Sequence, residues 1–146
     1  KGRKLQSLPV LHTTWQDWKT KHPDTIVLST ETGHNRNYAK SPYAVYLKSP
    51  RTMFPLTSVS RRYHPKEEVL GVESEGQFKA YPFVELEKGS AEFSDTFNGL
   101  GIIIRFDKKY RTASIFDQQG NQLPAVRTFW FAWYAFHPKT EVYVAP

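Results

Sequence analysis

The feature that most constrains the fold of this chain is an internal repeat near its two ends. Residues 8–27 read LPVLHTTWQDWKTKHPDTIV, and residues 123–142 read LPAVRTFWFAWYAFHPKTEV, aligned without a gap. Nine of the twenty positions are identical, where ordinary residue frequencies give about one match by chance. All four tryptophans lie in these segments. The repeat therefore predicts one local structure formed twice, which we call copy one (8–27) and copy two (123–142).

The tryptophan spacing predicts a short helix in each copy. In copy one, Trp15, Trp18 and His22 are spaced i, i+3 and i+7, which places them on one face of a two-turn helix. Thr13 is the expected N-cap, because Gln16 follows it three residues later, as in a capping box. The corresponding cap of copy two is Thr128.

A proline follows the histidine in both copies and predicts that the chain turns out of the helix there. The segments after these prolines, 25–30 and 140–144, are rich in β-branched residues, which favour strands. Each copy is thus expected to form a helix, a Pro turn and a strand.

The two copies differ on the remaining helix positions. Copy one has polar residues there, whereas copy two is apolar all round, with Phe131, Ala132, Tyr134, Ala135 and Phe136. A helix that is apolar on every side is either buried or covers a partner surface. Both interpretations stay open, and the second makes Phe131, Tyr134 and Phe136 candidate interface residues.

The segment 67–120 contains hairpin patterns. Residues 69–82 alternate about a turn at 74–76, and 101–106 and 112–116 form a second candidate hairpin. A further turn is expected at 117–120.

Residues 31–66 contain four prolines and no long periodic run, which predicts a loop-rich excursion with one short strand at 44–47. The chain is therefore expected to be a single domain over 1–146. Its predicted class is α+β, with antiparallel hairpins and a few short helices.

The formal net charge of +6 is unevenly distributed. Residues 32–66 contain seven basic and no acidic residues, whereas 67–95 contain eight acids and two lysines. A basic segment interleaved with aromatic residues is typical of nucleic-acid binding. We favour the alternative, in which the basic loop lies against the acidic hairpin of the same domain, so nucleic acid is not the expected partner.

The composition excludes several chemistries. There is no cysteine, so disulfides, thiolate metal sites and iron–sulfur clusters are excluded. No apolar run reaches the length of a membrane span. The sequence also lacks GxSxG, GxGxxG, the P-loop and HExxH. No cofactor is predicted. The equivalent histidines His22 and His137 are a candidate metal pair; the alternative is that each imidazole packs against its neighbouring indole.

A polar and aromatic cluster lies in the excursion. His34, Arg36, Tyr38 and Tyr43 follow one another closely, and an arginine fork framed by tyrosines can hold an anion. These four residues are the candidate ligand site, for a sugar or a small anion. The alternative is that Arg36 ties down a long loop.

Longer stretches resemble a known family. TTWQDWKTKHPDT, KEEVLGVESEGQFKAYPFVEL, FWFAWYAFHPKTEVY and the segment 38–46, with Tyr38, Pro42, Tyr43 and Tyr46, together resemble the domain of unknown function 3179 family. The resemblance implies an exported bacterial or archaeal protein, hence a periplasmic or secreted location. It assigns no activity.

The resemblance also implies which half of such a protein this chain represents. Family members carry a Cys-x-x-Cys-type motif at a position that falls on Asp107, Lys108, Lys109 and Tyr110 here, and these residues cannot perform thiol chemistry. The chain thus looks like a C-terminal, cysteine-free half. The first residue is Lys1 and not methionine. We therefore expect either that a leader has been removed or that the chain is part of a longer polypeptide.

Three functions follow as hypotheses. The first is a non-catalytic structural or protein-interaction half of a larger protein or homo-oligomer. The second is a ligand-binding module. The third is part of an enzyme whose redox motif lies in a missing half, with His34, Arg36 or Asp95 assisting.

Overall fold

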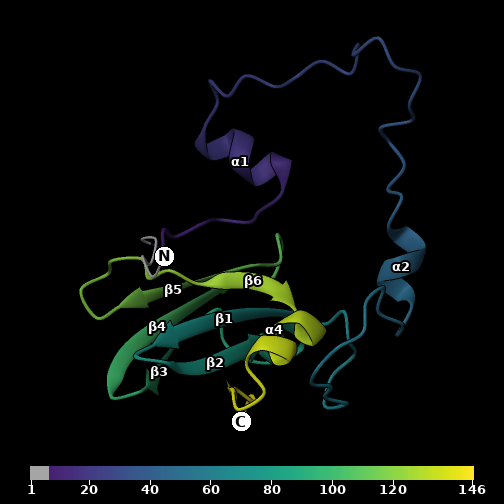
Figure 1. The fold of residues 1–146 in the computed structure, drawn as a ribbon. Helices are drawn as coiled ribbons and strands as arrows, with labels where there is room; N and C mark the ends of the chain where they lie inside the picture. The colour runs from purple at the N-terminus through teal and green to yellow at the C-terminus, as the bar shows by residue number, and fades with distance from the viewer. Residues whose placement is uncertain (1–6) are drawn as a thin grey trace, which may run out of the picture.

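A computed structural model describes residues 7–146 (Figure 1). Two sheets and a few short helices confirm the predicted α+β class. None of the helices described in residues 7–146 has the length and apolar character that a membrane span requires. In chain order the elements are α1 (Trp15–Lys21), α2 (Ala44–Lys48), β1 (Glu68–Ser74), β2 (Gln77–Pro82), α3 (Phe83–Leu86), β3 (Glu92–Phe97), β4 (Leu100–Asp107), β5 (Thr112–Asp117), β6 (Val126–Phe129), α4 (Trp130–Phe136) and β7 (Glu141–Val142).

The first sheet has the strand order β6-β1-β2-β7. Its centre is the predicted hairpin of β1 and β2, in which Gly71 lies opposite Ala80. The turn uses Glu75 and Gly76, both at positive φ, a conformation that glycine adopts without steric cost. Strand β6 pairs antiparallel with β1, and the short β7 pairs parallel with β2. Both outer strands come from copy two, so copy two completes this sheet.

The second sheet is the antiparallel meander β3-β4-β5. It contains the second predicted hairpin, formed by β4 and β5. The expected turn at 117–120 also forms, with the amide of Gly120 donating to the carbonyl of Asp117 at 3.1 Å. Leu123 then donates its amide to Ile115, which guides the chain from this sheet into copy two.

The alternation of β1 and β2 places apolar side chains on both faces of the first sheet. Leu70, Val72 and Tyr81 face the second sheet and form the larger core with Ile102, Ile104 and other residues of β3 to β5. The opposite face forms a smaller core with α4, made of Val69, Ala80, Trp130 and Trp133. The β1–β2 hairpin is thus buried from both sides.

The structure corrects four local predictions. Segment 44–47, expected as a strand, forms helix α2, and segment 25–30 forms no strand. The N-cap of α1 is Thr14, whose hydroxyl accepts the amide of Asp17 at 3.2 Å, one residue after the expected Thr13. Thr128 lies within β6, so it does not cap α4.

The basic side chains of the excursion do not pair with the acidic hairpin as expected, and the two segments are joined by the bond from the hydroxyl of Tyr63 to Glu85 Oε1, at 3.2 Å. Among the described residues, the acids of 67–95 form ion pairs with Lys79, Lys88, Arg105, Arg111 and Arg127, none of which belongs to residues 32–66. Within the excursion, the ammonium of Lys66 donates to the carbonyls of Ser49, at 2.8 Å, and Arg51, which fixes its later part to the residues just before β1. Most side chains of 31–62 remain exposed.

Candidate functional site

The two copies have the same internal hydrogen bond. The indole Nε1 of Trp18 donates to the hydroxyl of Thr25 at 2.9 Å, and that of Trp133 donates to Thr140 at 3.0 Å. Each bond joins the helix to the residue after the Pro turn. The helix and the turn are therefore fixed to each other by side chains within the copy.

The histidine at the end of each helix also takes the same position. His22 and His137 both donate their amides to the carbonyl of the preceding tryptophan, at 2.8 and 2.9 Å. Their rings lie 4.1 Å from Trp18 and 4.4 Å from Trp133, between centroids, as the packing interpretation predicts. Their backbone angles are nearly equal, with φ and ψ of −134° and 70° for His22 and −130° and 65° for His137.

Copy two packs its aromatic face on the β1–β2 hairpin. The indole of Trp133 lies directly over Gly71, where an added Cβ would overlap the ring. Trp130 packs against Val69 and is only 1% exposed. The imidazole of His137 stacks on Phe78, with centroids 3.8 Å apart and planes 20° from parallel. The hairpin thus has a complementary surface for Trp130, Trp133 and His137.

The strand of copy two then joins the edge of the same hairpin. Glu141 and Val142 pair with β2, and the amide of Tyr143 donates to the carbonyl of Ala80 at 2.9 Å. The ring of Tyr143 stacks on Phe93 at 4.8 Å. Copy two and the residue that directly follows it therefore contribute to both cores.

Copy one has the same internal geometry and no sheet. In Figure 1, α1 is drawn apart from both sheets, and among residues 7–146 no strand pairs with 25–28. We define the copy-one face as the residues equivalent to the docked residues of copy two and to Tyr143, which directly follows it. Its members are all exposed: Trp15, Trp18, His22, Val27 and Leu28. Trp15 is 50% and Leu28 is 95% exposed. A cluster of exposed apolar side chains of this kind marks an interaction surface.

The predicted interface residues of α4 have separate environments. Phe131 stacks on Phe129 and lies beneath the ammonium of Lys66, 5.7 Å from its ring centroid. Tyr134 packs against Trp130, and Phe136 is 81% exposed. The helix is therefore mainly packed within the molecule, and Phe136 is its exposed apolar residue.

The candidate ligand cluster lies on the exposed excursion. The guanidinium of Arg36 lies over the ring of Tyr38, 5.9 Å from its centroid, and the hydroxyl of Tyr38 bonds that of Thr32 at 2.7 Å. His34 and Tyr43 are exposed, and no described contact joins either of them to this pair. The structure brings together two of the four predicted residues.

The candidate metal pair lies on separate elements. His22 follows α1 and His137 follows α4, and these helices lie in different regions of the molecule (Figure 1). Within residues 7–146, no group of three or more His, Asp or Glu side chains could hold a metal ion. Burial lowers the pKa of His137, and the nearby carboxylate of Glu73 partly opposes this. His137 is thus favoured in its neutral form against Phe78.

One polar cluster between the sheets was not identified from the sequence. Lys79 Nζ lies 2.6 Å from Asp95 Oδ2, and the hydroxyl of Tyr81 donates to the same oxygen at 2.8 Å. Burial alone would raise the pKa of Asp95, but these two bonds lower it overall, while burial and Asp95 raise the pKa of Tyr81. The sequence does contain a signal for this cluster. Lys79 is two residues from the buried Tyr81 in β2, so both side chains lie on the same face of the strand. The three groups satisfy one another and join β2 to β3.

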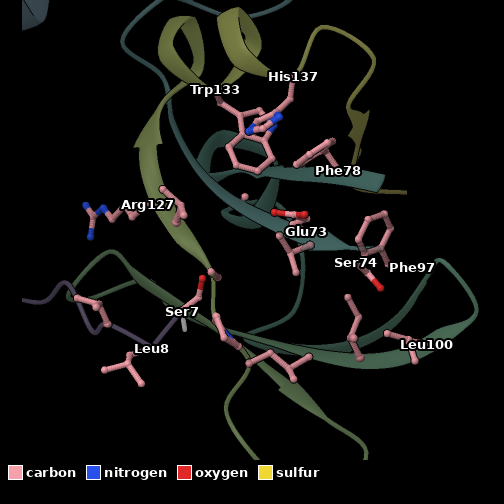
Figure 2. Close-up of a pocket in the computed structure, with 18 of the residues that line it drawn as sticks. Ser7, Leu8, Glu73, Ser74, Phe78, Phe97, Leu100, Arg127, Trp133 and His137 are labelled. Carbon is pink, nitrogen blue, oxygen red and sulfur yellow. The ribbon is translucent and has the colours of Figure 1, made fainter. Parts of the chain in front are cut away.

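A hollow of about 880 Å³ lies beside copy two (Figure 2). Trp133, His137 and Phe78 lie together on one side of it, and Glu73 also lines it. Residues of both copies line it, including the equivalent Leu8 and Leu123. The hollow therefore lies where the beginnings of the two copies approach each other.

Comparison with known proteins gives one match. A family model described as "Protein of unknown function (DUF3179)" matches residues 1–140. Neither the curated proteins nor the solved structures gave a match to the chain.

Proposed function

Because the chain belongs to the DUF3179 family, which assigns no activity, we propose from the chain's own geometry that it is a non-catalytic, protein-interacting half of a larger protein or assembly. The observation that supports this role is the exposed copy-one face. Its internal hydrogen bond and ring contact match those of copy two, which buries the equivalent residues on a sheet. A face with this build is suited to pack on protein.

The free energy available from covering this face is substantial. Fully burying a large apolar side chain contributes about 1.5 to 3 kcal/mol, and Trp15, Trp18, Val27 and Leu28 are all exposed. In copy two the corresponding contacts bury Trp130 and Trp133 almost completely. The same contacts at copy one would hold a partner firmly.

Hydroxyl-radical footprinting tests this role. The protein is isolated from its source under mild conditions and compared with the purified chain 1–146, and oxidation of each tryptophan is read by mass spectrometry. Trp15 and Trp18 are expected to be oxidised readily in the isolated chain and several-fold more slowly in the natural material. Trp130 serves as the internal control, because it is buried in both samples. Equal oxidation of Trp15 and Trp18 in the two samples would contradict the proposal.

A ligand-binding role is the second candidate, and the hollow beside copy two favours it. Aromatic side chains line the hollow together with the polar groups of Glu73 and His137, and this combination suits the binding of a sugar ring. Titration with monosaccharides, followed by tryptophan fluorescence, tests this candidate. Binding through the hollow should be lost in Trp133→Phe and retained in Trp18→Phe, and loss in Arg36→Ala would move the site to the excursion instead.

The proposal includes an extracytoplasmic location, which rests on the family resemblance alone. Fractionation of source cells tests it, and recovery in the cytoplasmic fraction would reject it.

A further inference from the structure

The excursion carries positive charge that the described part of the chain does not neutralise. Of the seven basic residues in 32–66, Lys66 is buried and the other six are exposed. Among residues 7–146, none of these six forms an ion pair, and 32–66 contains no acid of its own. The charge that was expected to be balanced within the domain is therefore available to an anionic partner.

Exposed apolar side chains lie in the same segment as this charge. We define the basic arm as residues 43–62, which contain four exposed basic residues: Lys48, Arg51, Arg61 and Arg62. The arm also exposes six large apolar side chains: Tyr43, Val45, Leu47, Met53, Phe54 and Val59. Two of them are almost entirely in solvent, with Val45 82% and Phe54 74% exposed. The basic arm thus combines positive charge with an apolar surface that nothing in the described chain covers.

The basic arm is fixed to the body of the protein at its base. The buried ammonium of Lys66 donates to the carbonyls of Ser49 and Arg51 and lies 4.1 Å from the ring centroid of Tyr46. A hollow of about 170 Å³ lies between the arm and α4, and Val59 and Phe131 are among the residues that line it. Figure 1 shows α2 and the loop after it outside both sheets. The arm is therefore held beside the sheets while most of its side chains remain exposed.

We propose that the basic arm binds the surface of a bilayer that contains anionic lipid. Binding at a bilayer surface uses apolar side chains that enter the headgroup region and basic side chains that attract anionic headgroups, and the arm supplies both. A nucleic acid would engage the charges and the aromatic rings, but it offers no partner for Val45, Met53 and Val59. An acidic protein would need carboxylates fixed opposite an irregular loop, whereas fluid headgroups adapt to any arrangement of charge. This inference goes beyond the proposed function, because the basic arm and the copy-one face share no residue.

Co-sedimentation of the chain with lipid vesicles tests the inference. Vesicles of phosphatidylcholine are compared with vesicles in which part of this lipid is replaced by phosphatidylglycerol. Binding should be at least about tenfold tighter to the anionic vesicles at low salt, and it should weaken as the salt concentration rises. Equal binding to the two kinds of vesicle would overturn the proposal.

Two pairs of variants locate the binding to the arm. Each basic residue near an anionic bilayer strengthens binding about fivefold, so Arg51→Gln combined with Arg61→Gln should weaken it about 25-fold. The control, Lys108→Gln combined with Lys109→Gln, removes the same charge from the exposed β4–β5 turn and should change binding by less than about twofold. An equal loss in the control would mean that net charge alone causes the binding, and the arm would be rejected as its site.

The apolar contribution has its own matched pair. Phe54→Ser should weaken binding to anionic vesicles roughly tenfold, whereas Leu28→Ser, on the copy-one face, should leave it unchanged. Both residues are exposed, so both variants should keep the fold, and circular dichroism verifies this. An equal loss in Leu28→Ser would show adsorption through any exposed apolar group and would reject the arm. A single-stranded oligonucleotide that binds the parent chain but not the Arg51 and Arg61 variant, with no binding to vesicles, would replace lipid by nucleic acid as the partner.

Discussion

Copy one and copy two share nine of twenty residues and the same hydrogen bond between helix and turn, yet only copy two is buried. Trp15 is 50% exposed, and its counterpart Trp130 is 1% exposed. The comparison teaches that the helix and the Pro turn are determined within the unit. The strand and the burial depend on a hairpin that the unit does not contain.

The largest expected difference concerns the second tryptophan of each copy. Trp133→Ala should lower the free energy of unfolding by about 3 to 5 kcal/mol, because it leaves a large cavity beneath α4. Trp18→Ala should lower it by less than about 1 kcal/mol, because Trp18 is exposed in this chain. Urea denaturation of the two variants measures both values. Similar losses would mean that copy one is packed as firmly as copy two.

Substitution of Gly71, which lies beneath Trp133, tests the surface of the hairpin on which copy two packs. Gly71→Ala should destabilise the protein by about 1 to 3 kcal/mol, because the new Cβ overlaps the indole. Gly89→Ala is the matched control, since a Cβ there meets its neighbours at 3.7 Å or more. Thermal denaturation compares them. A neutral Gly71→Ala would show that Trp133 can dock without a glycine.

The hydrogen bond within each copy gives a smaller difference. Thr140→Val leaves the indole N–H of the buried Trp133 without its acceptor, at an expected cost of about 1 kcal/mol. In Thr25→Val, water replaces the acceptor for the exposed Trp18, so the global stability should barely change. Equal costs in denaturation would contradict the difference in burial.

The pH dependence of copy two is smaller again. Because burial lowers the pKa of His137, the unfolded chain binds a proton at a pH at which the folded chain does not. The contribution of His137 to the free energy of unfolding is therefore complete above its unfolded pKa of about 6.5. This contribution is lost as the pH falls towards the pKa of His137 in the folded chain. The decline in melting temperature from pH 7 to 5 should be smaller in His137→Phe. If the melting temperature of His137→Phe declines as steeply as that of the parent protein, titratable groups other than His137 cause the decline.

The smallest effect is expected at the β4–β5 turn. Lys108→Ala and Lys109→Ala should each stay within about 0.5 kcal/mol of the parent protein, because both residues are exposed at a hairpin tip. Denaturation curves provide the check. A substantial loss at either residue would show that the tip packs on another part of the molecule.

Local features of the fold were predictable from the sequence because they depend on nearby residues. The turn at Glu75 and Gly76 and the Pro turn after each histidine follow from backbone preferences, and the helix of each copy follows from its tryptophan spacing. The α+β class follows from these elements. The N-cap was misplaced by one residue because Thr13 and Thr14 are adjacent and both carry a hydroxyl that can bond Asp17.

The remaining features depend on distant partners. Segment 25–30 has strand propensity but forms no strand, because no strand among the described residues pairs with it. Residues 141–142, in contrast, pair with β2. The burial of Trp133 depends on Gly71, far from it in sequence. The ion pair of Lys79 and Asp95 likewise joins two different sheets. Propensity within one segment contains no information about such contacts.

Hydrogen exchange of the isolated chain 1–146 tests most directly whether one unit is docked and its counterpart is open. The account predicts that the amide of Tyr143 is protected through its bond to Ala80, while the amide of Leu28 exchanges at the rate of an unstructured segment. Comparable protection at Leu28 and Tyr143 would mean that copy one already has a sheet within this chain, and the proposed interaction face would not exist.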